Sequence, residues 1–291
     1  MDEANPMLDA GRNSGLKRRH TFIMEGRTVD MIGCIHADMF FQERYLPSDV
    51  GIRIKLTRSK DTFCLMSAQP NAGYKVKIID CKFFVRKVKL LSSVFEAHAR
   101  AMETGNAKYP IRRAVCKTFT IPQGNLDFSQ EQLFSGTIPS RLVLAIVDND
   151  AFNGNYEKNP FHFKHYNLTH LKVTLDGQQQ NYTRPIEPNY EARQYIDAYM
   201  SLFSGTGKQQ KDEGTDITRE DYSQGYAIYA FDLTPDMSED SHFNLTKEGS
   251  VRVDFRFAQA LPNTVNIVAY GEFEQMIEID RNKQIIYDFT S

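Results

Sequence analysis

The sequence predicts an all-β protein, an antiparallel jelly-roll β-sandwich with a few short helices. Apolar and polar residues alternate with period two, most clearly in Val251, Val253, Phe255 and Phe257, which are separated by charged residues. This alternation is typical of antiparallel strands with one buried and one solvated face. Helical signals are few and do not alternate regularly with strands, which argues against a doubly wound α/β fold.

The same alternation locates most of the individual strands. Clusters of Gly, Pro, Asn and Asp separate many of the apolar segments, as expected between short strands. The uninterrupted apolar run 142–147 indicates a strand covered on both sides. We expect ten or more short strands, among them 52–57, 74–78, 115–121, 142–147, 171–175, 226–233, 251–257, 265–273 and 276–279.

Two segments are predicted to be helical. Ser93 and Glu96 form the sequence pattern of a capping box, and Gly105 closes the segment 94–104. Pro188 and Asn189 precede apolar residues at helical spacing over 192–203, and this helix is expected to end at Gly205. A further short turn of helix is expected after Asp127.

Composition excludes several classes of protein. The chain has 291 residues with 41% hydrophobic and 25% charged residues, a mean hydropathy of -0.48 and no apolar run of 18 residues, so no membrane-spanning helix is expected. No secretory signal is visible, and we expect an intracellular protein that is not secreted. The four cysteines, Cys34, Cys64, Cys81 and Cys116, are therefore expected to be reduced, buried and small apolar residues.

Charge is distributed unevenly along the chain. Residues 1–120 contain 21 Lys and Arg against 12 Asp and Glu, whereas the rest contains 14 against 25. Such asymmetry indicates a surface for nucleic acid or a partner, or two halves that complement each other. The second interpretation is favoured, because the basic residues alternate within predicted strands and form no continuous block.

Three short motifs resemble ligand sites without completing them. Ser204–Lys208 (SGTGK) lacks the first glycine of a phosphate loop and follows a helix instead of preceding one. Asp148 and Asp150 begin like a calcium loop, but Phe152 stands where a third oxygen ligand is needed. His162, His165 and His170 lie among aromatic residues with no matched zinc ligands, which favours aromatic packing.

One enzymatic hypothesis rests on His36 and Asp38. Jelly-roll oxygenases hold iron with an H-x-D pair and a distant histidine, for which His242 is the candidate, with Arg252 placed to bind a co-substrate carboxylate. Otherwise His36 and Asp38 share one face of a strand at a subunit contact. A lectin-like β-sandwich is a further alternative, and the absence of Trp argues against it.

Beyond these motifs, the chain resembles the C-terminal portion of the double jelly-roll major capsid proteins of Polinton/Maverick elements and adintoviruses. The resemblance runs from about Arg18 to the end of the chain, and none of its motifs is catalytic. It is carried by VDMIGCIHADMFFQER (29–44), IRIKLTRSKDTFCLMS (52–67), AKYPIRR (107–113), KTFTIPQGN (117–125), VDNDAFNGNYEKNPFHFKHYN (147–167), LFSGTGK (202–208), YAFDLTPD (229–236) and LPNTVNIVAYGEFEQMIEID (261–280).

The resemblance implies a structural capsid protein without catalysis or cofactor. Two jelly rolls would stand in tandem, and three copies would form a pseudo-hexameric capsomer that contacts other capsid proteins within a virion. Mapped onto this chain, residues 1–28 are a disordered tail, 29–73 the last strands of a truncated first jelly roll, and 74–291 a complete second one. A truncated gene model, a domesticated cellular copy and a fragment completed by another polypeptide all explain the short first part.

The long loops are the candidates for subunit contact. Exposure and length point to 148–155 and 204–216. The basic stretches 53–60 and 86–89 are candidates for non-specific contact with packaged DNA. The contact residues expected from these loops are Asp148, Asn149, Asp150, Asn153, Gly205, Gly207 and Lys208.

Overall fold

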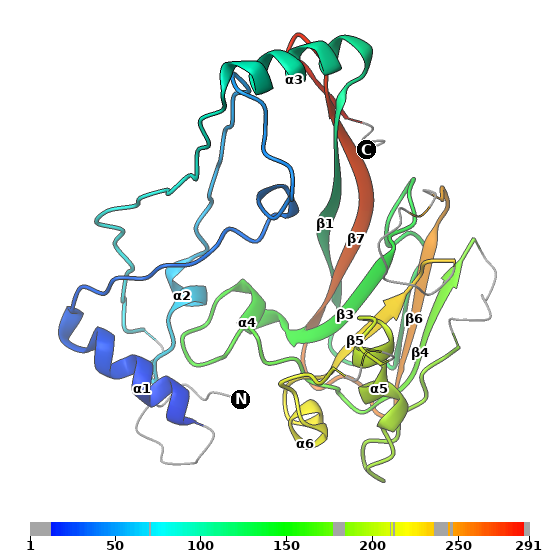
Figure 1. Cartoon of the computed structure of the whole chain (residues 1–291). Coiled ribbons are helices and arrows are strands. Elements are labelled where there is room, and N and C mark those ends of the chain that lie inside the picture. Colours follow the sequence, from blue (N-terminus) through cyan, green and yellow to red (C-terminus); the bar gives the residue numbers. More distant parts are fainter. Residues whose placement is uncertain are drawn as a thin grey trace.

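The computed structural model describes residues 13–69, 71–176, 184–209, 211, 213–235, 244 and 247–287. Two antiparallel sheets form the body of the molecule (Figure 1). In the first sheet the strand order is β1-β7-β3-β5, with β8 paired to β7; in the second it is β2-β6-β4. The strands are β1 (Ala107–Ile121), β2 (Asp127–Gln130), β3 (Arg141–Asp148), β4 (Leu168–Leu175), β5 (Ile228–Asp232), β6 (Val251–Phe257), β7 (Val265–Ile279) and β8 (Ile285–Tyr287).

The order of the strands is that of a jelly roll. From β1 to β7, consecutive strands alternate between the two sheets, so the chain crosses the core at every connection. An isolated antiparallel bridge between Leu171 and Ile186 continues the second sheet beyond β4. The predicted fold class is therefore confirmed: antiparallel sheets dominate, and the helices are short.

The core lies between the sheets and follows the predicted strand faces. Val251, Val253, Phe255 and Phe257 are buried, as the alternation in β6 predicts. In β3, every residue from Leu144 to Asp148 is buried, which agrees with a strand covered on both sides. Burial of each large apolar side chain contributes about 1.5–3 kcal/mol, so this layer is the main stabilising feature of the sandwich.

β1 and β7 extend well beyond the rest of the sheet. They pair over all fifteen residues, from Ala107 with Ile279 to Ile121 with Val265. β3 pairs with β7 only from Val265 to Glu272. The remaining halves of β1 and β7 project from the sandwich as a ribbon, joined by β8, with α3 (Ser92–Thr104) at its end (Figure 1).

The N-terminal part differs from its prediction. The described residues before Ala107 contain α1 (Ser14–Ile23), η2 (Met24–Gly26), η3 (Asp38–Phe40), α2 (Asp61–Cys64) and α3, but no strand. The strands expected at 52–57 and 74–78 are thus not formed, because no neighbouring strand pairs with either segment. Within the expected tail 1–28, residues Ser14–Ile23 form α1, which has no buried residue, and residues 1–12 lie outside the described part.

Several local predictions also need correction. The segment after Asp127 forms β2 and not a helical turn, because it pairs with β6. The two strands expected at 265–273 and 276–279 are one continuous strand. The capping box does not form: the cap of α3 is Leu91, without a side-chain hydrogen bond. All four cysteines are free and exposed, not buried.

Three further helices lie on or beside the sandwich. They are α4 (Asn149–Asn153), α5 (Ile196–Ser204) and α6 (Arg219–Ser223). α5 begins four residues later than the first apolar position of the predicted helix, since residues 190–193 form turns. No helix within the described residues is long and apolar enough to cross a bilayer.

Candidate functional site

A short segment, residues 38–45, lies along the open edge of β1, and we call it the edge clamp. Among the described strands, β1 is the terminal one of its sheet, so one side of its backbone has no neighbour among them. Four hydrogen bonds join the clamp to this strand: Arg112 N to Asp38 Oδ2 (2.8 Å), Gln42 Nε2 to Pro110 O (2.7 Å), Arg44 Nη1 to Lys108 O (3.0 Å) and Tyr109 Oη to Tyr45 O (2.9 Å).

The clamp satisfies backbone groups that a sheet edge would otherwise expose. Three of its four bonds use backbone atoms of β1 that point away from β7. The contact also joins two stretches that carry the sequence resemblance, 29–44 and 107–113. Sequence reasoning identified both stretches but not their contact, since they are about seventy residues apart.

The clamp changes the interpretation of His36 and Asp38. The Asp38 carboxylate accepts a hydrogen bond from β1, and the His36 ring stacks on Phe41 with ring centroids 5.9 Å apart. The third candidate ligand, His242, lies outside the described residues, and within those described no group of three His, Cys, Asp or Glu is placed to hold a metal. Arg252 pairs with Glu131 and Asp254. The structure thus offers no support for the oxygenase hypothesis.

A second cluster surrounds the buried carboxylate of Asp148, at the end of β3. Lys164 Nζ donates to it at 2.8 Å, and Tyr166 and Asn263 also donate to it. Burial alone would raise the pKa of Asp148, but these hydrogen bonds outweigh burial and lower the pKa to about 2. Burial and the neighbouring carboxylate raise the pKa of Tyr166. Asp148 is therefore a fixed anion that ties the loop before β4 and the β6–β7 loop to the end of β3.

The contacts of this cluster argue against a calcium loop at Asp148 and Asp150. Asp148 is 6% exposed and its carboxylate is occupied by donors from the chain itself. Asp150 accepts a hydrogen bond from Lys158 at 2.9 Å. Both carboxylates are thus paired with lysines.

The histidines near this cluster contribute to packing. Burial lowers the pKa of His162 and of His165 to about 4, so both are neutral at pH 7. His165 stacks on Tyr190 at 3.9 Å between ring centroids, and its Nδ1 accepts a hydrogen bond from Asn167 N. The predicted aromatic packing is confirmed for His165.

The predicted contact loops are only partly exposed. Asp150 and Asn153 are exposed, Asn149, Gly207 and Lys208 are half-buried, and Asp148 and Gly205 are buried. A Cβ atom at Gly205 would clash with the backbone carbonyl of Ala230, so this glycine lets the end of α5 pack on β5. Inferring exposure from loop length was wrong for Asp148 and Gly205. For the other five residues, subunit contact stays a prediction.

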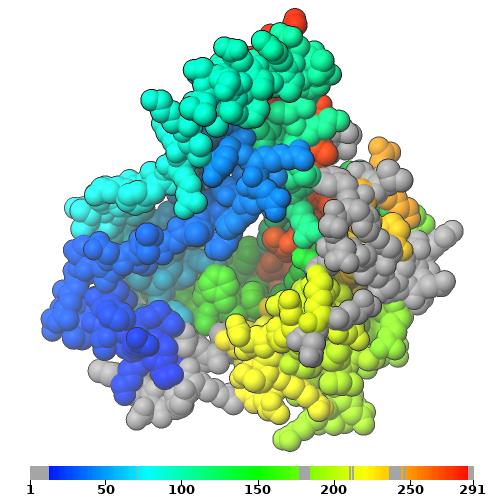
Figure 2. Space-filling view, viewed as in Figure 1, coloured from blue at the N-terminus to red at the C-terminus, as the bar shows by residue number. Residues whose placement is uncertain are grey.

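The N-terminal region presents a long exposed surface that is both apolar and basic. Residues 51–91 contain ten Lys and Arg against two Asp. Figure 2 shows these segments beside the sandwich, with a hollow between the two. Apolar residues that are at least half exposed in this region include Ile52, Leu56, Tyr74, Ile78, Ile79, Phe83, Phe84, Val85, Val88 and Leu91.

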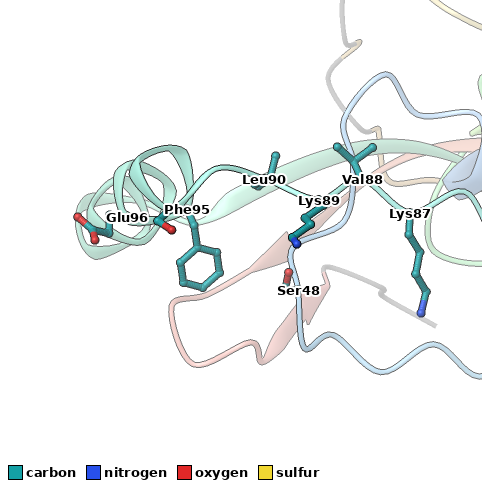
Figure 3. Close-up of a pocket in the computed structure, with 8 residues that line it drawn as sticks. Ser48, Lys87, Val88, Lys89, Leu90, Phe95 and Glu96 are labelled. Carbon is teal, nitrogen blue, oxygen red and sulfur yellow. The ribbon is translucent and has the colours of Figure 1, made fainter.

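One cavity of about 560 Å³ lies within this surface, at the start of α3. Figure 3 shows the Phe95 side chain projecting from the first turn of α3, with Lys87 at the other end of the lining. The lining is a mixture of aliphatic, basic, aromatic, hydroxyl and acidic groups. Its residues are Ser48, Lys87, Val88, Lys89, Leu90, Ser92, Phe95 and Glu96.

Comparisons with known proteins give one curated relative and several partial structural similarities. No family model matches the chain. An uncharacterised protein of Caenorhabditis elegans is 26% identical over 268 residues, covering 90% of this chain; the chain spans only 63% of that relative.

Several similar solved structures belong to viruses. They include a chain of the Sputnik virophage (TM-score 0.41, 14% identity, 63% of this chain and 39% of that one), the PBCV-1 virus capsid (0.36, 10%, 64% and 52%) and the mavirus major capsid protein (0.32, 11%, 64% and 42%). These TM-scores are too low to establish a shared fold, and the jelly-roll assignment rests on the strand order described above.

Proposed function

We propose that this chain is a non-catalytic structural protein, a capsid-like jelly-roll subunit that acts by assembling with other polypeptides. The observation that carries the proposal is the contrast in burial within one chain. The sandwich has a closed apolar core, whereas the apolar residues of 51–91 stay exposed. A second polypeptide surface that covers them would complete the molecule.

The size of the exposed surface supports assembly. A large apolar side chain that remains in water forgoes about 1.5–3 kcal/mol of burial free energy. Ten such residues are at least half exposed within 51–91. Exposed apolar surface of this extent, interspersed with polar groups, marks an interaction site in a soluble protein.

The sequence resemblance suggests which assembly this is. In the proposal, the chain belongs to the Polinton/Maverick and adintovirus lineage and forms a homotrimeric, pseudo-hexameric capsomer within a virion. Residues 29–73 then contribute the last strands of a first jelly roll, and 74–291 contain the second. The alternating segments 52–57 and 74–78 become strands when neighbouring strands are supplied by another polypeptide.

A contact with packaged DNA is a finer part of the same proposal. The stretches 53–60 and 86–89 carry seven Lys and Arg and no acidic residue. Their chemistry suits phosphate groups, and such binding weakens steeply as salt concentration rises. A shell whose inner face carries these stretches would hold DNA without reading its sequence.

The absolute mass of the purified chain in solution tests the proposal. Light scattering should give three times the chain mass, and negative-stain images of that peak should show discrete three-fold particles. A protein that remains a monomer at all accessible concentrations would contradict self-assembly. Stoichiometric metal in the purified protein, lost in His36→Ala, would instead favour the oxygenase hypothesis.

A further inference from the structure

The edge of β1 has two halves that differ in how their backbone groups are satisfied. Lys108 O, Pro110 O and Arg112 N all point to the open side, where the edge clamp binds them. Backbone groups of alternate residues point the same way in an antiparallel strand. The groups of Ala114, Cys116, Thr118 and Thr120 therefore point to the open side as well.

Within the part of the chain that the structure describes, the second half of this edge has no strand beside it. Among the residues that the structure describes, none forms a backbone hydrogen bond to the open side of β1 between Ala114 and Thr120. On the inner face, Val115 and Phe119 pack against the core but remain partly exposed. On the outer face, Ala114, Cys116, Thr118 and Thr120 are small and uncharged. An added strand would meet no bulky side chain on that face.

A segment with the matching pattern exists in the same chain. In 52–57, Ile52, Ile54 and Leu56 alternate with Arg53 and Lys55, and the three apolar side chains are 54%, 36% and 70% exposed. The segment forms neither a helix nor a strand. Residues 52–57 therefore have the pattern of a strand but no pairing partner among the described residues. The open half of β1 has backbone groups that could pair with such a strand.

We propose that residues 52–57 of a second copy of this chain add as an antiparallel strand to the open half of β1. The register that places Ile52 beside Phe119 and Leu56 beside Val115 also places Lys55 opposite Cys116. The apolar side chains then cover the partly exposed inner face. Arg53 and Lys55 lie on the outer face, beside Thr118 and Cys116, two positions of β1 that are exposed to solvent.

The inference rests on the proposed self-assembly and specifies one of its contacts. Lys117 limits which strands fit, because its side chain lies on the inner face with Nζ 5.3 Å from the centroid of the Phe134 ring. An inward lysine on an edge strand discourages indiscriminate pairing. Opposite it, the proposed register places Ile54, whose aliphatic side chain packs along the lysine stem.

Replacing Thr118 by proline tests the edge. Proline removes an N–H that points to the open side, and β1 already contains Pro110 at an equivalent position, so the pairing with β7 is retained. Thr118→Pro should weaken self-association of the full chain about tenfold or more, measured by light scattering over a concentration series. The matched variant Thr118→Ala keeps the N–H and should stay within about twofold of the wild type.

A cross-linking experiment identifies the occupant. One full-length chain keeps Cys116 alone, with the other three cysteines changed to Ser; a second chain has all four changed to Ser and carries Lys55→Cys. Mixed and oxidised, the two should form a disulfide-linked species of twice the chain mass. Opposed residues of neighbouring strands fall within the Cα separation that a disulfide requires. Lys60→Cys, outside the added strand, is the control and should not cross-link.

The outcomes separate this inference from the proposed function. A wild-type chain that never self-associates contradicts both. An oligomer that is unaffected by Thr118→Pro, or that gives no cross-link between Cys116 and position 55, overturns the strand addition and leaves self-assembly standing. A third variant carries both Cys116 and Lys55→Cys in one chain; if it cross-links only within itself, the inference is also overturned, because the strand would then come from the same copy.

Discussion

β6 and the segment 52–56 carry almost the same alternation of apolar and charged residues, yet their environments are opposite. In β6 the alternate residues Val251, Val253, Phe255 and Phe257 are buried against the facing sheet. In the N-terminal segment, Ile52 and Leu56 are 54% and 70% exposed. The difference is that β6 has β2 and β4 as neighbours and a sheet opposite. Alternation therefore encodes the capacity to form a strand, and a partner determines whether that capacity is used.

The strongest test of this difference in burial is to place the same charge in both regions. Phe255→Asp puts a carboxylate into the sandwich core, where an unpaired charge is costly, and should prevent soluble folding. Ile54→Asp should leave the thermal unfolding midpoint of the monomer unchanged, because Ile54 lies outside the core. Soluble yield and thermal unfolding provide the readout. A cooperatively melting Phe255→Asp protein would show that the strand faces are wrongly assigned.

Asp148 allows a second test within the sandwich. Its pKa is lowered to about 2 from an ordinary 3.8, so its contribution to stability is present above about pH 4 and is lost as pH falls towards 2. The shift corresponds to roughly 2 kcal/mol. Asp148→Asn should lower the free energy of unfolding at pH 7 by about that amount. In urea unfolding at a series of pH values, the variant should lose less stability between pH 4 and 2 than the wild type.

The matched control for this test is Asp150→Asn, two residues further along. Its carboxylate is exposed and pairs with Lys158 at the surface, where an ion pair contributes little. The control should leave the acid limb of the stability curve unchanged. Equal effects at the two positions would refute the assignment of Asp148 as the buried anion.

The edge clamp predicts the smallest effect, because it links the two regions through four hydrogen bonds only. The double variant Asp38→Ala and Gln42→Ala should lower stability by about 1 kcal/mol. Its clearest consequence is faster hydrogen exchange of the Arg112 amide, which donates to Asp38. Glu43→Ala, in the same segment but exposed, should not alter that rate.

The sandwich was largely predictable because its pattern is local. The faces of β6 and the double-sided burial of β3 follow from residues read a few at a time. The pairing of β2 with β6 is not local, and Asp127 was wrongly expected to begin a helix. Cys116 was expected to be buried; its exposure follows from the alternation of β1, but Lys117 on the inner face obscures that pattern.

The contacts of the candidate site were less predictable for the same reason. Asp148 meets Asn263, 115 residues further along, and Asp38 meets Arg112, 74 residues further along. Each of these stretches had been singled out, but a single sequence contains no signal that pairs them. A complete local pattern can also mislead. Ser93 and Glu96 have the spacing of a capping box, but its side-chain hydrogen bond does not form.

The unbroken pairing of β1 with β7 makes the projecting ribbon and the core a single mechanical element. Fifteen residues of strand span roughly 50 Å, from α3 at one end to Ile121 and Val265 inside the sandwich at the other. A force on α3 is transmitted along the β1–β7 pair as shear on its hydrogen bonds. The fully buried ends anchor it. A displacement of α3 is therefore transmitted to the centre of the sandwich, some tens of ångströms away.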